Sequence, residues 1–189
     1  MVSALEIGAN AGNVVSIVLA ARNSVHTWWI GTLSCALFAW LFYGTQLYAD
    51  VTLQVFFVLT SALGWWHWQR GSGENLPIRH SGFTRIALYC LVALVSALIY
   101  GALLWHYTQA FAPFLDSLVL AFSVLGQVLL MGRRVETWYA WIVVNSIAVP
   151  LYAVRGLEVT AALYFFFWCN AWYGLYRWRR ELRVELVDG

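Results

Sequence analysis

The sequence contains no lysine and few charged residues of any kind. Of its 189 residues, 11% are charged and 62% are hydrophobic, whereas about a quarter of a soluble domain is charged. The mean hydropathy is +0.69. A chain this poor in charge cannot cover a water-facing surface, so the composition predicts an integral membrane protein made of helices. The net charge of +2 gives no reason to expect a nucleic acid as partner.

Residues that support catalysis or metal binding are equally scarce. Cys35, Cys90 and Cys169 lie singly inside apolar runs, which is typical of packing residues rather than of redox or metal sites. No histidine pairs with a second ligand at metal spacing, and no HExxH, GxSxG or phosphate-binding loop occurs. We therefore expect no enzyme, no catalytic residue, no metal and no cofactor. A signal-peptide pattern is also missing, so the first helix is expected to be retained.

Long apolar runs are what the sequence has in abundance. A hydrocarbon core about 30 Å thick requires roughly 17–25 apolar residues per helix. Seven runs meet this requirement: 4–21, 28–46, 50–68, 84–106, 114–131, 137–154 and 159–178. The longer polar segment from Arg70 to Gly82 is the expected linker.

Arginine is distributed unevenly between the two ends of these seven spans. Ten arginines fall in the loops and tail of one side, and Arg155 alone falls on the other. Because cations are enriched in cytoplasmic loops, the pattern predicts a cytoplasmic C-terminus and an outer N-terminus. A count of six or eight spans would mix the cations between the two sides.

The two ends of the chain resemble each other at a fixed offset of 110 residues. The matches include Thr27 with Thr137, Trp28 with Trp138, Gly64 with Gly174, Trp68 with Trp178 and Arg70 with Arg180. This repeat predicts three helices in 1–70, a loop and connecting helix in 71–112, three helices in 113–180 and a cytoplasmic tail in 181–189. A single connecting helix makes the two triplets parallel, an arrangement that transporters use with a site near the midplane between the repeats. The alternative is that duplication only builds a stable bundle.

The run 137–154 carries the most informative polar residue. Trp138, Trp141, Asn145 and Tyr152 are spaced by three, four and seven, which puts them on one side of a helix. The Asn145 carboxamide needs a partner, because leaving it unpaired in an apolar medium costs several kcal/mol. Another helix, a water molecule or a substrate could supply that partner. We expect a substrate.

Further carboxamides and aromatic residues extend this predicted site. The expected substrate-binding residues are Gln54, Phe57, Gln127, Trp141, Asn145, Asn170 and Tyr173. Carboxamides donate and accept hydrogen bonds, which suits a neutral ligand with hydroxyl or amide groups, and aromatic faces stack on a heterocycle. The alternative for each carboxamide is a hydrogen bond that joins two helices without any ligand.

Several motifs together resemble the PnuC family of vitamin transporters. They are Leu47–Asp50, Leu53–Phe57 and Gly64–Trp68 in the first half, and Arg133–Trp138, Trp141–Asn145 and Gly156–Leu157 in the second. The resemblance covers nearly the whole chain and implies a bundle of three, one and three helices, similar to a SWEET transporter. It also implies facilitated diffusion of a nicotinamide riboside-type vitamin precursor across the bacterial inner membrane without ion coupling. A cytoplasmic kinase would then trap the product.

The ligand itself is less closely indicated. The pair Trp141 and Asn145 is similar to the nicotinamide riboside branch of the family, whereas thiamine-type members have an acidic residue at the position of Asn145. Ser34 stands where enterobacterial riboside transporters carry an asparagine, which leaves the exact ligand open. Thiamine, riboflavin or another nucleoside-like molecule is the alternative, and a non-transporting membrane scaffold is a further one. The expected partners are the small-molecule substrate, the lipid bilayer and a functionally coupled kinase, and a homo-oligomer is left open.

Overall fold

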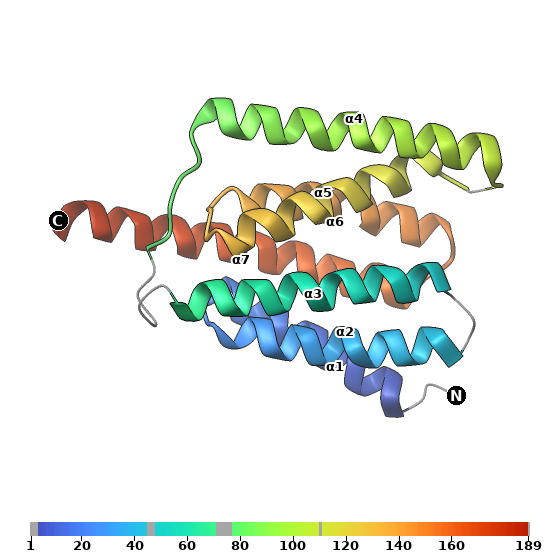
Figure 1. Ribbon diagram of the computed structural model, residues 1–189, viewed down its shortest axis with the longest axis horizontal. Helices are drawn as coiled ribbons and strands as arrows, with labels where there is room; N and C mark the ends of the chain where they lie inside the picture. Colours follow the sequence, from blue (N-terminus) through green and yellow to red (C-terminus); the bar gives the residue numbers. More distant parts are fainter. Residues whose placement is uncertain (1–3, 45–47, 71–76, 110, 189) are drawn as a thin grey trace. The chain divides into compact units, whose positions relative to one another are not determined.

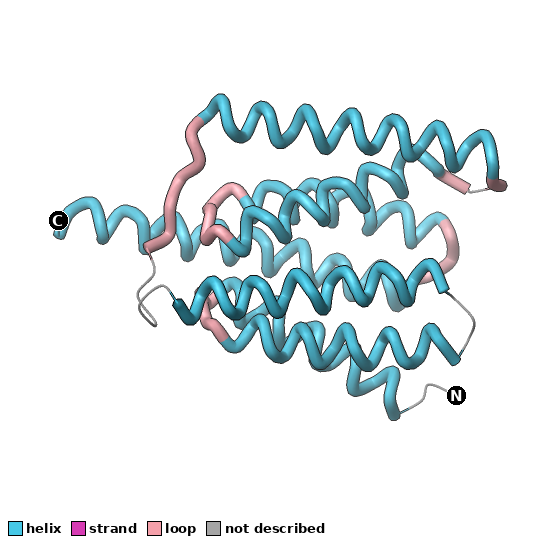
Figure 2. The backbone as a smooth tube through the Cα atoms, viewed as in Figure 1, coloured by secondary structure: helices cyan, strands magenta, loops and turns pink. Residues whose placement is uncertain are grey.

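Seven α-helices make up the described part of the chain. The computed structural model describes residues 4–44, 48–70, 77–109 and 111–188 (Figures 1 and 2). The helices are α1 (Ala4–Ala21), α2 (His26–Gly44), α3 (Tyr48–Arg70), α4 (Phe83–Tyr107), α5 (Pro113–Met131), α6 (Thr137–Val154) and α7 (Glu158–Asp188). No strand occurs within these residues, where the only extended pairing is an isolated bridge between Arg79 and Arg134. Each predicted span corresponds to one helix.

Helix ends agree with the predicted spans to within two residues, except at the end of α7. This helix was expected to end at residue 178, but it continues to Asp188. The segment after Trp178 contains neither proline nor glycine until Gly189, so nothing in it stops a helix. The Arg177 side chain also donates a 3.0 Å hydrogen bond to Glu181 one turn later, a spacing that supports helical structure. The predicted tail is therefore largely a helical extension.

Hydropathy distinguishes the seven helices. Among the described residues, α4, α5 and α6 are long and apolar enough to cross a membrane, and Leu5–Ala21 of α1 forms a shorter apolar helix. The other helices mix apolar residues with Trp, Tyr and amide side chains, which lowers their average hydropathy. That all seven cross the bilayer stays a prediction.

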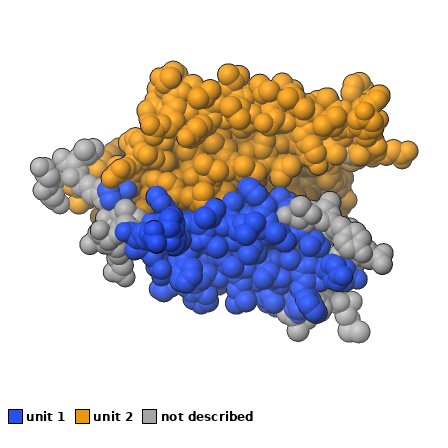
Figure 3. Space-filling view, in the orientation of Figure 1, with its two compact units in different colours: residues 1–77 blue, residues 78–189 orange. Residues whose placement is uncertain are grey.

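The helices form two compact units (Figure 3). Residues 1–77 belong to unit 1 and residues 78–189 to unit 2. In unit 1, α2 packs against both α1 and α3. In unit 2, α6 packs against both α5 and α7, and α4 packs against α5. Each unit therefore contains three helices whose middle member contacts both others.

Two buried tryptophan pairs occupy corresponding positions in the two units. The Trp28 and Trp68 rings lie edge to face with centroids 5.3 Å apart, and the Trp138 and Trp178 rings do the same at 5.4 Å. All four side chains are at most 2% exposed. Edge-to-face packing is a favoured aromatic geometry, worth about 0.5–1.5 kcal/mol beyond the burial of area. The first pair holds α3 against α2, and the second pair holds α7 against α6.

The turns after α1 and α5 also share one geometry. Each contains a residue in the left-handed region, Asn23 with φ 55° and Arg133 with φ 48°. The hydrogen bonds that close the two turns run from Ser24 N to Leu19 O (3.0 Å) and from Arg134 N to Leu129 O (2.9 Å). This is the Schellman arrangement, which satisfies the free carbonyls at a helix end. Asparagine adopts left-handed φ values readily, whereas arginine does so at an energetic cost.

Arg133 is also buried, with 3% of its surface exposed. Burial of the guanidinium lowers the pKa of Arg133 to about 10, and the negative charge of Glu181 acts in the opposite direction. Arg133 remains charged at neutral pH. Its position ties the α5–α6 turn electrostatically to the extension of α7.

α4 is held by a narrow stripe of small residues. Ala93, Ala97 and Gly101 are its buried positions, spaced by four residues and so aligned along one side. A methyl group on Gly101 would lie 2.6 Å from Cδ1 of Phe114, so glycine allows the close approach of α4 to the start of α5. The remaining surface of α4 is largely apolar and exposed, as expected of a helix in contact with lipid.

The segment before α4 is attached to the α5–α6 turn. The backbone N–H of Arg79 donates to the carbonyl of Arg133 over 3.0 Å, and the N–H of Val135 donates to the carbonyl of Arg79 over 3.1 Å. The later part of the predicted linker Arg70–Gly82 is therefore bound to unit 2 rather than independent of it. Residues 71–76 lie outside the described residues.

The arginines of unit 2 gather at one end of its helices. Arg134 donates from Nη1 to the carbonyl of His80 over 3.0 Å, and Arg179 donates to the hydroxyl of Tyr139. These contacts place the start of α4, the α5–α6 turn and the late part of α7 together. Arg155 lies instead at the α6–α7 turn, where it forms a 2.7 Å ion pair with Asp116 of α5. Within unit 2 the cations are thus divided as the sequence predicts; the membrane side of each end stays a prediction.

Candidate functional site

Asn145 is a buried carboxamide on α6 with 3% of its surface exposed. Its Nδ2 donates a 2.8 Å hydrogen bond to the carbonyl of Trp141 one turn earlier. This is a local bond within one helix and, among the described residues, the bond shown for the carboxamide. It leaves the second N–H as a donor and the oxygen as an acceptor. The amide plane is therefore oriented by the helix itself.

Trp141 packs against the backbone of α5 at Gly126. A methyl group on Gly126 would lie 3.0 Å from Cε2 and 3.1 Å from Nε1 of the indole, which is closer than side chains normally approach. The Trp141 indole is partly exposed, whereas the Trp138 indole is fully buried. A partly exposed aromatic face one turn from an oriented carboxamide can stack on a ring while the amide binds a polar substituent.

The stripe predicted on α6 is divided between two neighbouring helices. Trp138 packs on Trp178 and Gly174 of α7, whereas Trp141 packs on α5. Tyr152 lies against Tyr164 of α7, with ring centroids 4.9 Å apart. Three residues along a helix turn the side chain by about 60° short of a full turn, and this difference is enough to reach a different neighbour. Trp138 is therefore structural, which its match with the buried Trp28 also indicates, and Trp141 is the tryptophan available to a site.

The remaining predicted residues of unit 2 differ in exposure. Gln127 on α5 is 9% exposed and Asn170 on α7 is 7% exposed, so both are buried amides, and Asn170 has an interaction partner. Tyr173 on α7 is 47% exposed. No contact that joins these three residues to Asn145 is shown. Their place in the site stays a prediction.

Gln54 and Phe57 belong to α3 of unit 1. Both side chains are partly buried, and the Phe57 ring lies edge to face with Phe56 at 5.6 Å. At the offset of 110 residues they correspond to Tyr164 and Phe167 of α7. Neither is shown in a hydrogen bond or ring contact with another helix, so their role also stays a prediction. Ser34, which departs from the riboside pattern, donates a 2.6 Å bond to the carbonyl of Ala9 and so serves packing within unit 1.

Thr137 lies beside the candidate site, and the sequence singled it out only as a repeat match of Thr27. Thr137 donates from Oγ1 to the carbonyl of Gly126 over 2.8 Å, which fixes the crossing of α5 and α6. The same bond occurs in unit 1, where Thr27 donates to the carbonyl of Ser16 over 2.8 Å. The repeat contained this signal, because the two pairs have the same spacing of eleven residues.

Acidic residues lie at helix ends in the described part of the chain. Glu6 and Asp116 are in first turns, as is Glu158, and Glu136 precedes α6. Within the described residues no group of three or more His, Cys, Asp or Glu side chains could hold a metal ion. The interior polar groups of the candidate site are therefore neutral.

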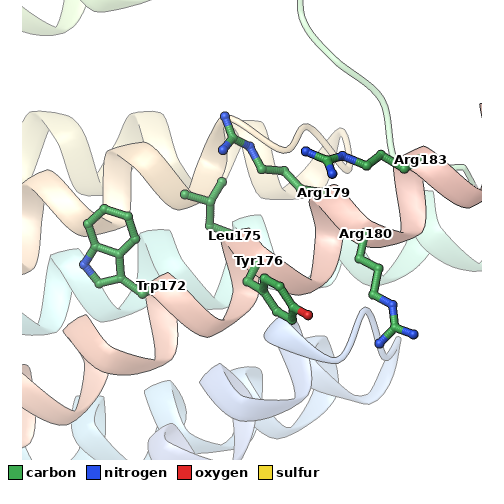
Figure 4. Close-up of a pocket in the computed structure, with 6 residues that line it drawn as sticks. All are labelled: Trp172, Leu175, Tyr176, Arg179, Arg180 and Arg183. Carbon is green, nitrogen blue, oxygen red and sulfur yellow. The ribbon is translucent and has the colours of Figure 1, made fainter.

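A separate cavity of about 440 Å³ lies along the late part of α7 (Figure 4). It is lined by Trp172, Leu175, Tyr176, Arg179, Arg180 and Arg183. The aromatic side chains precede the arginines along the helix, the order expected where a helix passes from the membrane interface to the headgroups. None of the predicted site residues lines this cavity.

Known proteins resemble this chain over most of its length. One relative is the nicotinamide riboside transporter PnuC of Escherichia coli (strain K12), which is 26% identical over a match that covers 84% of this chain and 77% of the relative. Another is the nicotinamide riboside transporter PnuC of Neisseria mucosa, which is 24% identical over a match that covers 90% of this chain and 70% of the relative. The riboflavin/roseoflavin transporter RibM of Streptomyces davaonensis is 23% identical and covers 94% of this chain and 87% of its own.

A solved structure and a family model agree with these relatives. The crystal structure of the vitamin B3 transporter PnuC matches with a TM-score of 0.76 at 24% identity, covering 95% of this chain and 82% of that one, which shows a common fold. The family model described as nicotinamide mononucleotide transporter matches residues 3–180. The protein is therefore an all-α membrane protein that belongs to the nicotinamide mononucleotide transporter family, a family of transporters and not of enzymes.

Proposed function

We propose that the protein imports nicotinamide riboside, or a closely similar vitamin precursor, across the bacterial inner membrane by facilitated diffusion. Phosphorylation by a cytoplasmic kinase would trap the product and keep the inward gradient. The observation that carries the proposal is the Trp141–Asn145 pair on α6, a partly exposed indole one turn from an oriented, neutral carboxamide. A ribose or a nicotinamide amide offers the donors that the Asn145 oxygen accepts, and the ring offers a face for the indole.

The absence of ion coupling in the proposal is supported by electrostatics. Intramembrane carboxylates are the usual carriers in proton- or cation-driven pumps. Glu6, Asp116, Glu136 and Glu158 lie near helix ends, and Glu181 lies in α7 beyond the predicted span 159–178. Asp116 is paired with Arg155 at 2.7 Å and Glu181 with Arg177 at 3.0 Å. The neutral interior suits passive exchange of an uncharged or ring-charged ligand. Metabolic trapping then supplies the direction.

We further propose that the two triplets, α1–α3 and α5–α7, are parallel repeats with the substrate near the bilayer midplane. The shared tryptophan pairs and left-handed turns support a common ancestry of the triplets. The gathering of arginines at one end of unit 2 supports a cytoplasmic C-terminus and an outer N-terminus. Within unit 2, the predicted residues Gln127, Asn170 and Tyr173 would extend the site beyond Trp141 and Asn145.

Riboflavin is the second candidate substrate. The similarity to RibM covers a larger share of both chains than the similarity to the E. coli riboside transporter. A flavin is a larger heterocycle with a ribityl chain, so it offers the same kinds of contact to an indole and a carboxamide. Thiamine is a weaker candidate. Its ring is cationic, as is that of nicotinamide riboside, but it also carries an aminopyrimidine, whose amino group would favour a carboxylate where this chain has Asn145.

The test is direct binding followed by transport. Purified protein is titrated by calorimetry with nicotinamide riboside, riboflavin and thiamine in turn. Proteoliposomes are then loaded with or without a riboside kinase and ATP, and uptake of labelled ligand is measured. We expect riboside binding, equilibration without kinase and accumulation with it. Binding of none of the three ligands, or accumulation that requires a proton or sodium gradient, would overturn the proposal.

A further inference from the structure

The crossing of α5 and α6 is built around one glycine. The Gly126 carbonyl accepts the 2.8 Å hydrogen bond from Thr137, and its Cα faces the Trp141 indole one turn further along α6. Asn145 follows after another turn and donates to the Trp141 carbonyl. The three α6 residues are spaced by four and lie in one column. Thr137 and Trp141 of this column thus both contact the backbone of α5 at Gly126.

In the corresponding helix crossing of unit 1, the glycine lies on the second helix instead of the first. At the offset of 110 residues, Ser16 takes the place of Gly126 and Gly31 takes the place of Trp141. A methyl group on Gly31 would lie 2.9 Å from the Ser16 Oγ, so the small residue there faces a larger one on the neighbouring helix. The Ser16 hydroxyl donates to the Thr27 carbonyl over 2.8 Å. The same threonine-anchored crossing therefore exists in two versions, and only the one in unit 2 carries an indole.

We propose that Gly126 is a positioning residue of the transport site. It determines how close the Trp141 indole lies to α5, and so the position of the ring relative to the Asn145 carboxamide. This position sets the affinity for a ring-bearing ligand. This inference rests on the proposed function, since it assumes that Trp141 contacts the substrate. A methyl group at 3.0 Å from the indole forces the ring to shift by a few tenths of an ångström away from α5. Because the Thr137 bond uses the backbone carbonyl of residue 126, it survives the substitution, and the helix crossing remains.

The first experiment compares Gly126→Ala, Trp141→Phe and the double variant in calorimetric titrations with nicotinamide riboside. We expect each single variant to weaken binding by about tenfold, the usual scale of a steric misfit in a packed site. The double variant should bind no more weakly than Trp141→Phe alone, because the smaller phenyl ring leaves room for the added methyl group. This non-additivity separates a role through the indole from a general packing role.

The matched control is Gly12→Ala. Gly12 also lies at a helix crossing, where a methyl group would be 3.3 Å from Cβ of Ser34, and the three nearest atoms all belong to Ser34. Riboside affinity should stay within about twofold of wild type, since the crowding is confined to α1 and α2. Thermal melting of every variant is recorded beside the titrations.

A second variant covers the case in which Gly126→Ala does not fold. Gly126→Ser combined with Trp141→Gly copies the Ser16 and Gly31 pair of unit 1 into unit 2. We expect a folded protein that has lost riboside binding. Wild-type affinity in this variant would overturn the inference.

The first experiment distinguishes failure of this inference from failure of the proposed function. Unchanged affinity of Gly126→Ala, or the same tenfold loss in the Trp141→Phe background, would overturn the inference and leave the proposed function intact. A wild-type protein that binds none of the three vitamins would overturn both.

Discussion

The Trp138 indole occupies the space that a side chain on Gly174 would need. A methyl group on Gly174 would lie 2.6 Å from Cε2 of Trp138, and a methyl group on Gly64 would lie 2.4 Å from the Trp28 ring. In each triplet, α1–α3 and α5–α7, a glycine on the last helix therefore leaves room for an indole from the middle helix. This pairing explains why tryptophan and glycine recur together at the offset of 110 residues.

The first prediction concerns these two glycines. Gly174→Ala and Gly64→Ala should each lower the free energy of unfolding by about 1–3 kcal/mol, the usual cost of overpacking. Thermal melting in detergent measures the effect. Gly8→Ala is the matched control, because a methyl group there meets nothing within 4 Å; it should be neutral or slightly stabilising. Equal melting temperatures for all three variants would show that the indoles move aside freely.

The second prediction concerns Asn145. Asn145→Cys introduces the residue that Cys35 supplies at the corresponding position of unit 1. We expect riboside binding to become undetectable, while the melting temperature changes little because the lost bond is a single local one, worth about 1 kcal/mol. Calorimetry and thermal melting of the same preparation check both parts. If the variant binds with wild-type affinity, the carboxamide serves the helix only.

The third prediction concerns the left-handed turn at Asn23. Asn23→Val should lower the free energy of unfolding by about 1–2 kcal/mol, because a β-branched residue is strained at φ 55°. Asn23→Gly and Asn23→Asp, which both tolerate this φ, should change it by less than about half as much. Unfolding in a denaturant series distinguishes the three variants. Equal stability of the valine and glycine variants would mean that the turn adopts another conformation.

The fourth prediction concerns the orientation of unit 2 in the membrane. In a variant that lacks Cys35, Cys90 and Cys169, a cysteine at position 155 should react with a membrane-impermeant maleimide added to intact cells. A cysteine at position 85 should react only after the membrane is permeabilised. The ion pair of Arg155 is about one quarter to one third exposed, so its loss should cost at most about 1 kcal/mol and leave the protein folded. Reaction of both cysteines from outside would contradict the predicted topology.

The sequence predicted the helices well because their cause is local. Apolar runs of sufficient length between arginine-rich turns leave no other way to satisfy the backbone in a membrane. The one clear misplacement, the end of α7, arose because a span-length argument says nothing about a helix that continues into water. The link between Arg79 and the α5–α6 turn was also missed, since a bridge between residues over fifty positions apart leaves no pattern in either segment.

The sequence likewise predicts part of the candidate site, and the packing of the helices supplies the rest. The sequence alone predicts Trp141 and Asn145 as site residues, because a lone carboxamide in an apolar helix is conspicuous and the 110-residue offset places Cys35 at the corresponding position of the first half. That these two residues bind a ligand stays a prediction. The repeat also separates the two tryptophans, because Trp138 matches Trp28 whereas Trp141 matches Gly31. It could not show which neighbour each indole meets: Gly174 on α7 lies against Trp138, and Gly126 on α5 lies against Trp141. Composition and spacing thus predicted an integral membrane protein of seven helices, and the resemblance to the PnuC family added the transporter function. The tertiary structure decided which helix each indole packs against, because only the neighbouring helices fix where a ring has room to lie.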